Sequence, residues 1–187
     1  MLLYRDIVSN DELFSDAFPI KEVEDIAIEV DCKMIQVKQG ADVDIGANPS
    51  AEEADESLED GVETVNNVVY SFRLTQTSFD KKSYMTYIKG YMKRLKQELQ
   101  EINKERVPIF EKKASTLVKG ILENLKDYEF YIGESMDPEG MVALLNYRED
   151  GVTPYFTFFK DGLKVEKLKN QFAHSFLSVM VIPSVIS

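Results

Sequence analysis

The sequence predicts an α+β domain in which short strands precede and follow a pair of long helices. Short apolar pieces separated by turn-forming residues fill the first forty positions, helical periodicity runs from about 80 to 126, and strand patterns return from 128. Strands grouped on either side of a helical hairpin are typical of an α+β architecture. A length of 187 residues fits one domain, and a hydrophobic content of 44% is enough for a core.

The first strands are predicted at LLYRDIV, DIAIEV and KMIQVK, and strand character returns at VNNVVYSFRL. Between them, residues 41–63 contain nine acidic side chains and neither lysine nor arginine. Such a segment buries too little apolar area to offset the entropy lost on ordering it. We therefore expect a mobile acidic loop at 41–63.

Two amphipathic helices are predicted within 80–126. In the first, apolar residues recur every three or four positions, at Tyr84, Ile88, Tyr91, Leu95, Leu99 and Ile102. Asp80 suits its N-cap, because a carboxylate can accept a hydrogen bond from an unpaired backbone N–H. Pro108 suits the first turn of the second helix. That helix has an apolar face of Ala114, Leu117, Val118, Ile121, Leu122 and Leu125. The short link between the two helices predicts an antiparallel hairpin.

The remaining strands are predicted at YEFYIGE, MVALLNYRE and VTPYFTFFK. Asp150-Gly151 separates the last two and is a strong signal for a tight β-hairpin turn. Asp161-Gly162 marks a further turn. The C-terminal part of the domain is therefore expected to be β-structure.

Charge is distributed unevenly along the chain. The formal net charge is −11, yet the segment 81–126 carries twelve basic and five acidic residues. On a helical projection centred on Ile88, one flank of the first helix holds Lys82, Lys89, Lys93 and Lys96. A row of cations without acids among them suits a partner with clustered carboxylates. The simpler interpretation is the solvated face that any amphipathic helix has.

Composition narrows the possible functions. The acidic net charge argues against nucleic-acid binding, and the chain has no apolar stretch of 18 residues that could span a membrane. Arg5 and Asp6 interrupt the apolar run that a signal peptide needs. Cys32 and His174 are each the only residue of their kind, so neither an internal disulfide nor a two-histidine metal site can form. Chemistry based on two carboxylates stays open.

A calcium loop is suggested by part of the acidic segment. Asp42, Asp44 and Glu53 occupy the first, third and twelfth positions of the calcium-loop pattern. Gly46 is at the fifth position rather than the sixth, and Pro49 follows it, which argues against an EF-hand. We expect at most weakly bound calcium here and no other cofactor.

Two long stretches resemble known family signatures. IGANPSAEE (45–53) and FYIGESMDPEGMVALLNYREDGVTPYFTFFKDGL (130–163) resemble the two signatures of the translationally controlled tumour protein family, with fungal members most similar. The resemblance covers about residues 1–167. Family chains usually stop after a sequence like KVEK, which ends here at Lys167. Residues 168–187 are therefore an atypical C-terminal extension that we expect to be poorly ordered.

The resemblance implies a β-tent of two small, mainly antiparallel sheets with a long helical hairpin and a flexible acidic loop. It also implies an abundant cytoplasmic, partly cytoskeleton-associated protein that is not an enzyme. Such proteins bind tubulin and stabilise microtubules, bind calcium, and associate with translation elongation factors. Ras-type small GTPases and anti-apoptotic Bcl-family proteins are further implied partners.

One more residue gains a role from the resemblance. Glu12, next to Asp11 after the first strand, matches the family position for a small-GTPase contact. The local alternative is that Asn10 or Asp11 caps a short turn. The main hypothesis is thus an interaction protein that binds tubulin through the hairpin lysines. A regulator of a Ras-type GTPase acting through Glu12, and an enzyme based on paired carboxylates, are the alternatives.

Overall fold

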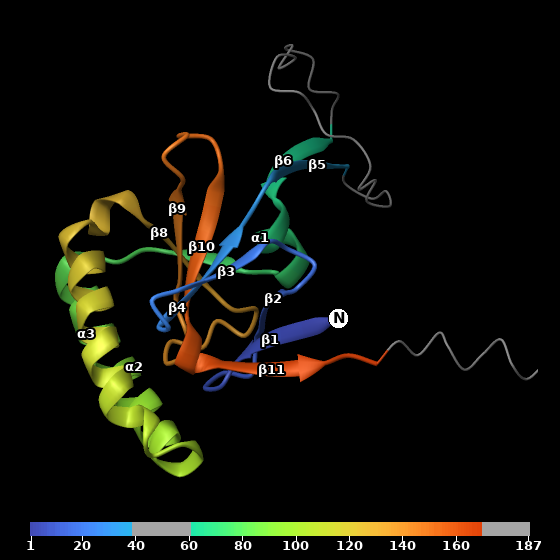
Figure 1. Ribbon diagram of the computed structural model, residues 1–187. Helices are drawn as coiled ribbons and strands as arrows, with labels where there is room; N and C mark the ends of the chain where they lie inside the picture. The colour runs from blue at the N-terminus through green and yellow to red at the C-terminus, as the bar shows by residue number, and fades with distance from the viewer. Residues whose placement is uncertain (39–60, 170–187) are drawn as a thin grey trace, which may run out of the picture.

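The computed structural model describes residues 1–38 and 61–169, and its mixture of strands and helices confirms the α+β prediction (Figure 1). The strands are β1 (Leu2–Asp6), β2 (Glu12–Ser15), β3 (Ile20–Val23), β4 (Ala27–Asp31), β5 (Met34–Lys38), β6 (Val62–Asn66), β7 (Thr75–Thr77), β8 (Glu129–Ile132), β9 (Ala143–Tyr147), β10 (Pro154–Phe159) and β11 (Leu163–Lys167). The helices are α1 (Asn67–Phe72), α2 (Lys81–Ile102) and α3 (Arg106–Glu123), with 3-10 turns η1 (Leu125–Asp127) and η2 (Lys160–Gly162).

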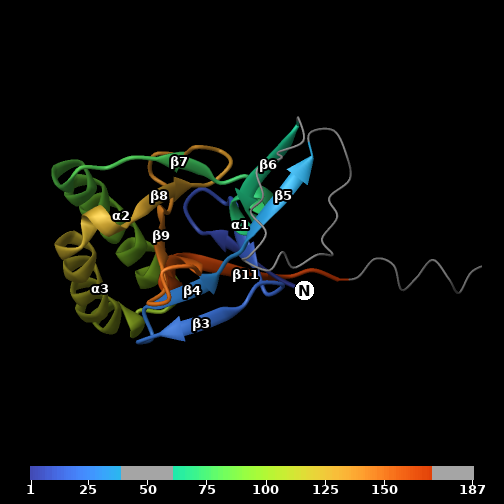
Figure 2. The same cartoon turned by 90° about the horizontal axis from the view of Figure 1, so that it is seen from above.

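The described strands form three antiparallel sheets, where the resemblance implied two. The largest has the order β3-β4-β10-β9-β8-β7, the second β11-β1-β2, and the third is the pair β5-β6. The hairpin of α2 and α3 lies on one side of the six-stranded sheet, and the three-stranded sheet lies on the other side (Figures 1 and 2). The six-stranded sheet is therefore the central layer of the domain.

Strand β10 shows why both sides of this sheet are covered. Successive side chains of a strand point to opposite faces, so a strand buried on both faces is apolar throughout. Phe158 packs against Phe14 of β2, with ring centroids 4.6 Å apart. Its neighbour Phe159 packs against Tyr91 of α2 on the other face, at 6.0 Å. The apolar run at the end of β10 thus joins the two halves of the core.

The prediction of a strand throughout VNNVVYSFRL was wrong. Strand β6 ends at Asn66, and the short helix α1 follows it. The side-chain oxygen of Asn66 accepts hydrogen bonds from the backbone N–H groups of Val68 and Val69, at 2.9 and 3.3 Å. Arg73 then ends the helix in the left-handed conformation, with φ of 52°. Capping by Asn66 and the full burial of Val68 outweigh the strand preference of the two valines.

The two segments predicted to be mobile fall mostly outside the described residues. This is the case for residues 41–60 of the acidic loop and for residues 170–187 of the C-terminal extension. Val62 and Glu63, which were assigned to the loop, are part of β6 and pair with Lys38 and Val37 of β5. The predicted loop therefore extends two residues too far toward the C-terminus.

Both Asp-Gly turns are present. In the β9–β10 hairpin, the carboxylate of Asp150 accepts hydrogen bonds from the backbone N–H and the hydroxyl of Thr153, at 2.8 and 2.7 Å. Gly151 adopts a φ of +70°, which glycine tolerates best. In η2, a Cβ atom on Gly162 would collide with the Tyr91 hydroxyl group. Glycine at this position therefore allows α2 to approach the sheet closely.

Candidate interaction surface on the helical hairpin

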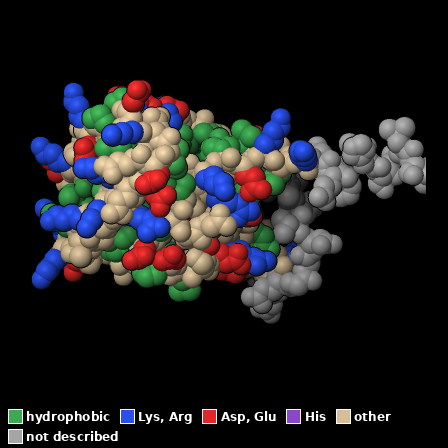
Figure 3. All heavy atoms as spheres, turned by 90° about the horizontal axis from the view of Figure 1, so that it is seen from below, with side chains coloured by type: hydrophobic (Ala, Val, Ile, Leu, Met, Phe, Trp, Pro, Cys, Tyr) green, Lys and Arg blue, Asp and Glu red, His purple; other side chains and the backbone are tan. Residues whose placement is uncertain are grey.

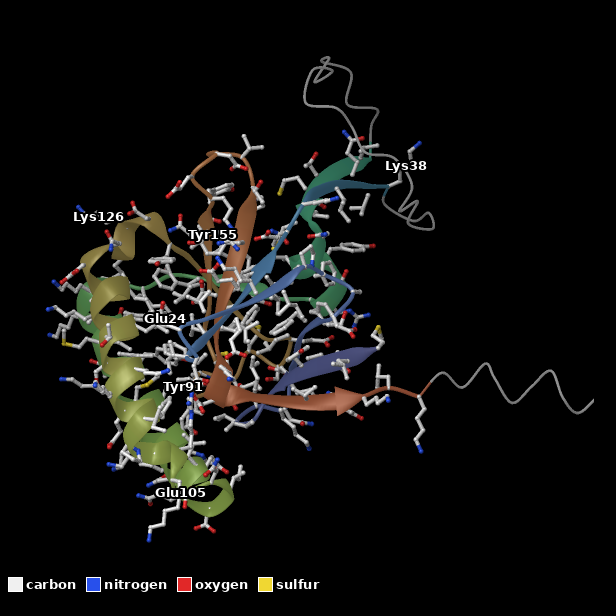
Figure 4. All side chains as sticks on the ribbon, viewed as in Figure 1. Glu24, Lys38, Tyr91, Glu105, Lys126 and Tyr155 are labelled. Atoms are coloured by element: carbon white, nitrogen blue, oxygen red, sulfur yellow. The ribbon has the colours of Figure 1, made fainter. Side chains whose placement is uncertain are left out.

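Helix α2 is held in one rotation by its buried face. Its N-cap is Asp80, as predicted: the carboxylate accepts a hydrogen bond from Ser83 N at 2.7 Å. Five of the six apolar residues predicted to face the core are buried, namely Tyr84, Ile88, Tyr91, Leu95 and Leu99. Tyr91 lies between the hairpin and the sheet (Figure 4). The sixth, Ile102, is 73% exposed, because the tip of the hairpin projects beyond the strands (Figure 1).

Helix α3 completes the predicted antiparallel hairpin. It begins at Arg106, so Pro108 lies in its first turn as expected. Its buried residues are Val107, Phe110, Ala114 and Ile121, whereas Leu117, Val118 and Leu122, together with Leu125 of η1, are half-buried against the core. Glu105 directly precedes the helix, and Lys126 of η1 follows it at the opposite end (Figure 4). The half-buried positions leave part of the apolar face accessible.

A charged network that sequence reasoning missed attaches the hairpin to the sheet. The guanidinium group of Arg106 donates two hydrogen bonds to the carboxylate of Asp161, at 2.8 and 2.9 Å. Asp25, in the β3–β4 turn, forms ion pairs with Lys160 at 2.7 Å, with Arg106 at 2.5 Å and with Lys113 at 3.1 Å. Hydrogen bonds from Lys160, Arg106 and Lys113 hold the pKa of Asp25 well below its ordinary value. The network restrains α3 at its N-terminal half.

The predicted lysine flank of α2 is exposed, but it is not free of acids. Lys82, Lys89 and Lys93 are exposed, and within residues 1–38 and 61–169 none of them forms an ion pair. Lys96, in contrast, lies 2.5 Å from Glu111 of α3. A projection of one helix cannot show an acid that a neighbouring helix contributes. Lysine and arginine side chains gather over the hairpin end of the molecule (Figure 3).

A groove of about 760 Å³ runs between α2 and α3. Its floor contains Met85, Met92, Val118 and Leu122, all half-buried. The edge formed by α2 carries Lys81, Lys89, Lys93 and Lys96, whereas Lys82 does not line the groove. The edge formed by α3 has mixed charge, with Glu111, Lys119 and Glu123. We call the four α2 residues at this edge, Lys81, Lys89, Lys93 and Lys96, the lysine edge.

The candidate GTPase contacts Asp11 and Glu12 are both engaged within the protein. The Asp11 carboxylate accepts hydrogen bonds from the Ser135 hydroxyl at 2.6 Å and from Ser135 N at 3.2 Å. Glu12 lies 2.7 Å from Arg5, and its side chain is 48% exposed. Arg5 also binds Glu166 of β11 at 2.9 Å. Asp11 therefore holds the loop that contains Ser135, and the carboxylate of Glu12 is held in one position at the surface by Arg5.

The turn after β1 is capped by Asp6 rather than by Asn10 or Asp11. Asp6 is 1% exposed, and its carboxylate accepts hydrogen bonds from the N–H groups of Val8, Ser9 and Met141, at 3.0, 3.2 and 2.8 Å. From the sequence, Asp6 was recognised only as a charge that interrupts an apolar run. Its role as the turn cap could have been predicted, because an aspartate followed by Ser9 and Asn10 is typical of a turn.

The structure offers no metal site in its described part. Asp42, Asp44 and Glu53 lie outside the described residues, and so does His174. Within 1–38 and 61–169, no group of three or more His, Cys, Asp or Glu side chains could hold a metal ion. Cys32 is buried, and this burial raises the pKa of its thiol to about 11. In the same ranges, no helix has both the length and the apolar character that crossing a bilayer requires.

The fold and the hairpin define the class of the chain as an α+β protein with a basic, grooved helical hairpin beside a central sheet. The family model described as "Translationally controlled tumour protein" matches residues 1–164. A homologue from Schizosaccharomyces pombe is 70% identical over 167 residues, which are 89% of this chain and 99% of that protein. A homologue from Saccharomyces cerevisiae is 58% identical over 168 residues, 90% of this chain and 100% of that protein. The chain belongs to the translationally controlled tumour protein family.

Solved structures of the family have the same fold. The S. pombe structure, titled as a translationally controlled tumor-associated protein, matches with a TM-score of 0.77 at 70% identity. The Caenorhabditis elegans protein matches with a TM-score of 0.67 at 33% identity. Each match covers 90% of this chain and the whole of the compared chain. The fungal resemblance inferred from the two signature stretches is thereby confirmed.

Proposed function

We propose that this chain is a cytoplasmic, non-enzymatic interaction protein that binds tubulin through the lysine edge of its hairpin. The supporting observation is that Lys89 and Lys93 are exposed and form no ion pair within the described residues. Neighbouring lysine side chains repel one another unless a partner supplies anionic groups that neutralise them. Clustered carboxylates, such as those of the acidic tubulin tails, would satisfy these lysines.

The overall charge makes such binding selective. A chain with a net charge of −11 repels an acidic partner at every surface except a basic one. Attraction of this kind acts over a screening length of about 8 Å at physiological ionic strength. The basic hairpin would therefore orient the protein on an acidic lattice and accelerate association.

The test is co-sedimentation with microtubules. Lys89→Glu combined with Lys93→Glu should fold normally and weaken association by about tenfold or more, since each substitution turns an attraction into a repulsion. Wild-type association should fall steeply as salt is raised from about 50 to 300 mM.

The matched control is Lys112→Glu combined with Lys126→Glu. It makes the same change in net charge on exposed residues of α3 and η1 that do not line the groove. The control should retain most of the binding. Equal loss in both double variants would mean that only net charge matters, and binding indifferent to salt and to both variants would refute the proposal.

A small GTPase is the second candidate partner, and one observation favours it. Glu12 is half-exposed, and Arg5 fixes its carboxylate in one position. A fixed carboxylate can accept a charge-assisted hydrogen bond from a partner lysine or arginine with little loss of side-chain entropy. Glu12→Gln should then weaken binding to a Ras-type GTPase in a pull-down and leave microtubule binding unchanged.

The other functions implied by the family stay predictions. Calcium binding by Asp42, Asp44 and Glu53 involves residues outside the described ranges. Association with elongation factors and with Bcl-family proteins has no residue-level support in the hairpin geometry. An enzyme based on paired carboxylates has no support either: Asp161, Asp25 and Asp6 are engaged with arginine, lysine and a backbone N–H group, respectively.

A further inference from the structure

The floor of the hairpin groove suggests a more specific partner than an acidic tail. Met85 and Met92 of α2 and Val118 and Leu122 of α3 are half-buried and form an apolar strip between the helices. An extended chain of glutamates would neutralise the lysine edge but leave this strip exposed to water. Apolar surface gains free energy only when it is covered by apolar surface.

The groove has the dimensions and the form of a helix-binding site. Along α2 it extends from Lys81 to Lys96, which corresponds to about 22 Å at 1.5 Å per residue. A helix of about 15 residues has the same length. Methionine side chains are flexible and adapt to different apolar partners, which is why they are common at helix-binding surfaces.

The charges at the two edges differ, and this difference sets an orientation. The charged residues at the edge formed by α2 are all basic, and among the described residues only Lys96 of this edge has an acidic partner. The edge formed by α3 alternates between Glu111, Lys119 and Glu123. A bound helix should therefore place its acidic flank along α2 and a flank of mixed or neutral character along α3.

We propose that the groove between α2 and α3 binds an amphipathic helix of a partner protein, with an apolar stripe on the floor and a row of acidic residues along the lysine edge. This inference rests on the proposed function, because it takes the lysine edge as the place where acidic partners bind. It adds that the recognised segment is helical and partly apolar. A bilayer surface is a poorer fit, because a flat membrane does not enter a concave groove between two helices.

The probe for this proposal is a synthetic 15-residue helix with leucines at i, i+3, i+4 and i+7 spacing and glutamates on one flank, which we call the striped peptide. A scrambled peptide of identical composition has the same charge but no continuous stripe of leucines. The striped peptide should bind about tenfold or more tightly than the scrambled one. In the protein, Met85→Gln combined with Leu122→Gln should remove this preference, and thermal unfolding checks that the variant folds.

Methionine methyl signals in NMR spectra locate the peptide. The methyl signals of Met85 and Met92 should shift on titration with the striped peptide. Met34 and Met136 serve as internal controls, because they are 48% and 57% exposed and do not line the groove. Lys89→Glu combined with Lys93→Glu should weaken binding of the striped peptide more than Lys119→Glu does, because the acidic flank of the peptide lies along α2.

The outcomes separate this inference from the proposed function. Equal binding of both peptides, with loss only in the lysine variants, would overturn the helix-in-groove inference and leave the lysine edge as an electrostatic site. If none of the variants lost any binding, both the helix-in-groove inference and the proposed function would be overturned. A third outcome is that vesicles of phosphatidylserine and phosphatidylcholine shift the methyl signals of Met85 and Met92 and the striped peptide does not. That result would assign the groove to a membrane surface instead.

Discussion

Lys96 of α2 and Glu111 of α3 face each other across the groove, with 2.5 Å between Nζ and Oε1. Both side chains are nearly half-exposed, so the pair contributes only about 0–1 kcal/mol to stability. If the lysine edge binds acidic partners as proposed, the pair also affects binding, because Glu111 neutralises one of the four cations of this edge.

Replacing Glu111 by glutamine should therefore strengthen binding to acidic partners. Glu111→Gln leaves Lys96 unpaired, and we expect microtubule affinity to rise about two- to fivefold at low salt, as one added attraction of about 0.5–1 kcal/mol predicts. The matched control is Glu101→Gln, which removes one negative charge from the opposite flank of α2. The prediction fails if both variants raise the affinity equally.

Arg106 should be the residue that most strongly fixes the hairpin to the sheet. Its guanidinium group contacts Asp161 with two parallel hydrogen bonds and also contacts Asp25. Arg106→Ala should lower the free energy of unfolding by about 1.5–3 kcal/mol, as expected for lost hydrogen bonds between charged groups. Urea denaturation measures this loss.

The conservative variant tests whether geometry or charge matters at this position. Arg106→Lys keeps the charge but loses the planar fork that matches a carboxylate. We expect it to recover less than half of the lost stability. Full recovery would mean that the charge of Arg106 alone, rather than its paired hydrogen bonds, holds the hairpin.

Asp25 should make stability depend on acid pH. Its pKa is lower in the folded protein than its unfolded value of about 3.9, because Lys160, Arg106 and Lys113 bind the carboxylate form. The unfolded chain therefore takes up the proton first as the pH falls. The stabilising contribution of Asp25 is fully present above about pH 4 and is lost progressively below it.

Asp25→Asn removes this contribution, so the variant should be less stable than wild type at pH 7. The difference between the two urea midpoints should shrink as the pH falls from about 5 to 2.5. Asp127→Asn is the control, because Asp127 is exposed and forms no ion pair within the described residues. A difference that stays constant over this pH range would contradict a role for the ionised carboxylate.

The periodic elements could be predicted from the sequence because local chemistry determines them. Apolar spacing located α2, Asp80 marked its start, and Asp150-Gly151 marked the β9–β10 turn. One exception was α1, where two valines suggested a strand and a side-chain cap from Asn66 produced a helix. The short strands β7 and β11 are further exceptions, because they lie outside every predicted strand. Such a cap depends on one rotamer, and a propensity pattern does not reveal it.

The candidate site was only partly predictable, because its decisive features join two elements. The projection of α2 located Lys89 and Lys93 correctly on an exposed flank. It could not show that Glu111 pairs with Lys96, nor that Met92 and Val118 share one groove. These relationships depend on the packing of α3 against α2, which no pattern within a single helix contains.

Asp11 and Glu12 are adjacent in sequence, and the last prediction separates their roles. Asp11 holds Ser135 through two hydrogen bonds, and there is no room for a side chain at Gly133 beside it. Asp11→Ala should therefore lower the free energy of unfolding by about 1–2 kcal/mol. Glu12→Gln breaks a surface ion pair with Arg5 and should cost less than about 1 kcal/mol.

Binding should show the reverse order. If Glu12 contacts a partner directly, Glu12→Gln weakens GTPase binding while its thermal unfolding stays close to wild type. Arg5→Gln provides the matched test, because it removes the residue that fixes Glu12 without removing the carboxylate itself. A pull-down in which Arg5→Gln binds better than Glu12→Gln would support direct contact by Glu12. Equal loss in both variants, together with equal loss of stability, would mean that the carboxylate serves only to hold β1 and β2 together.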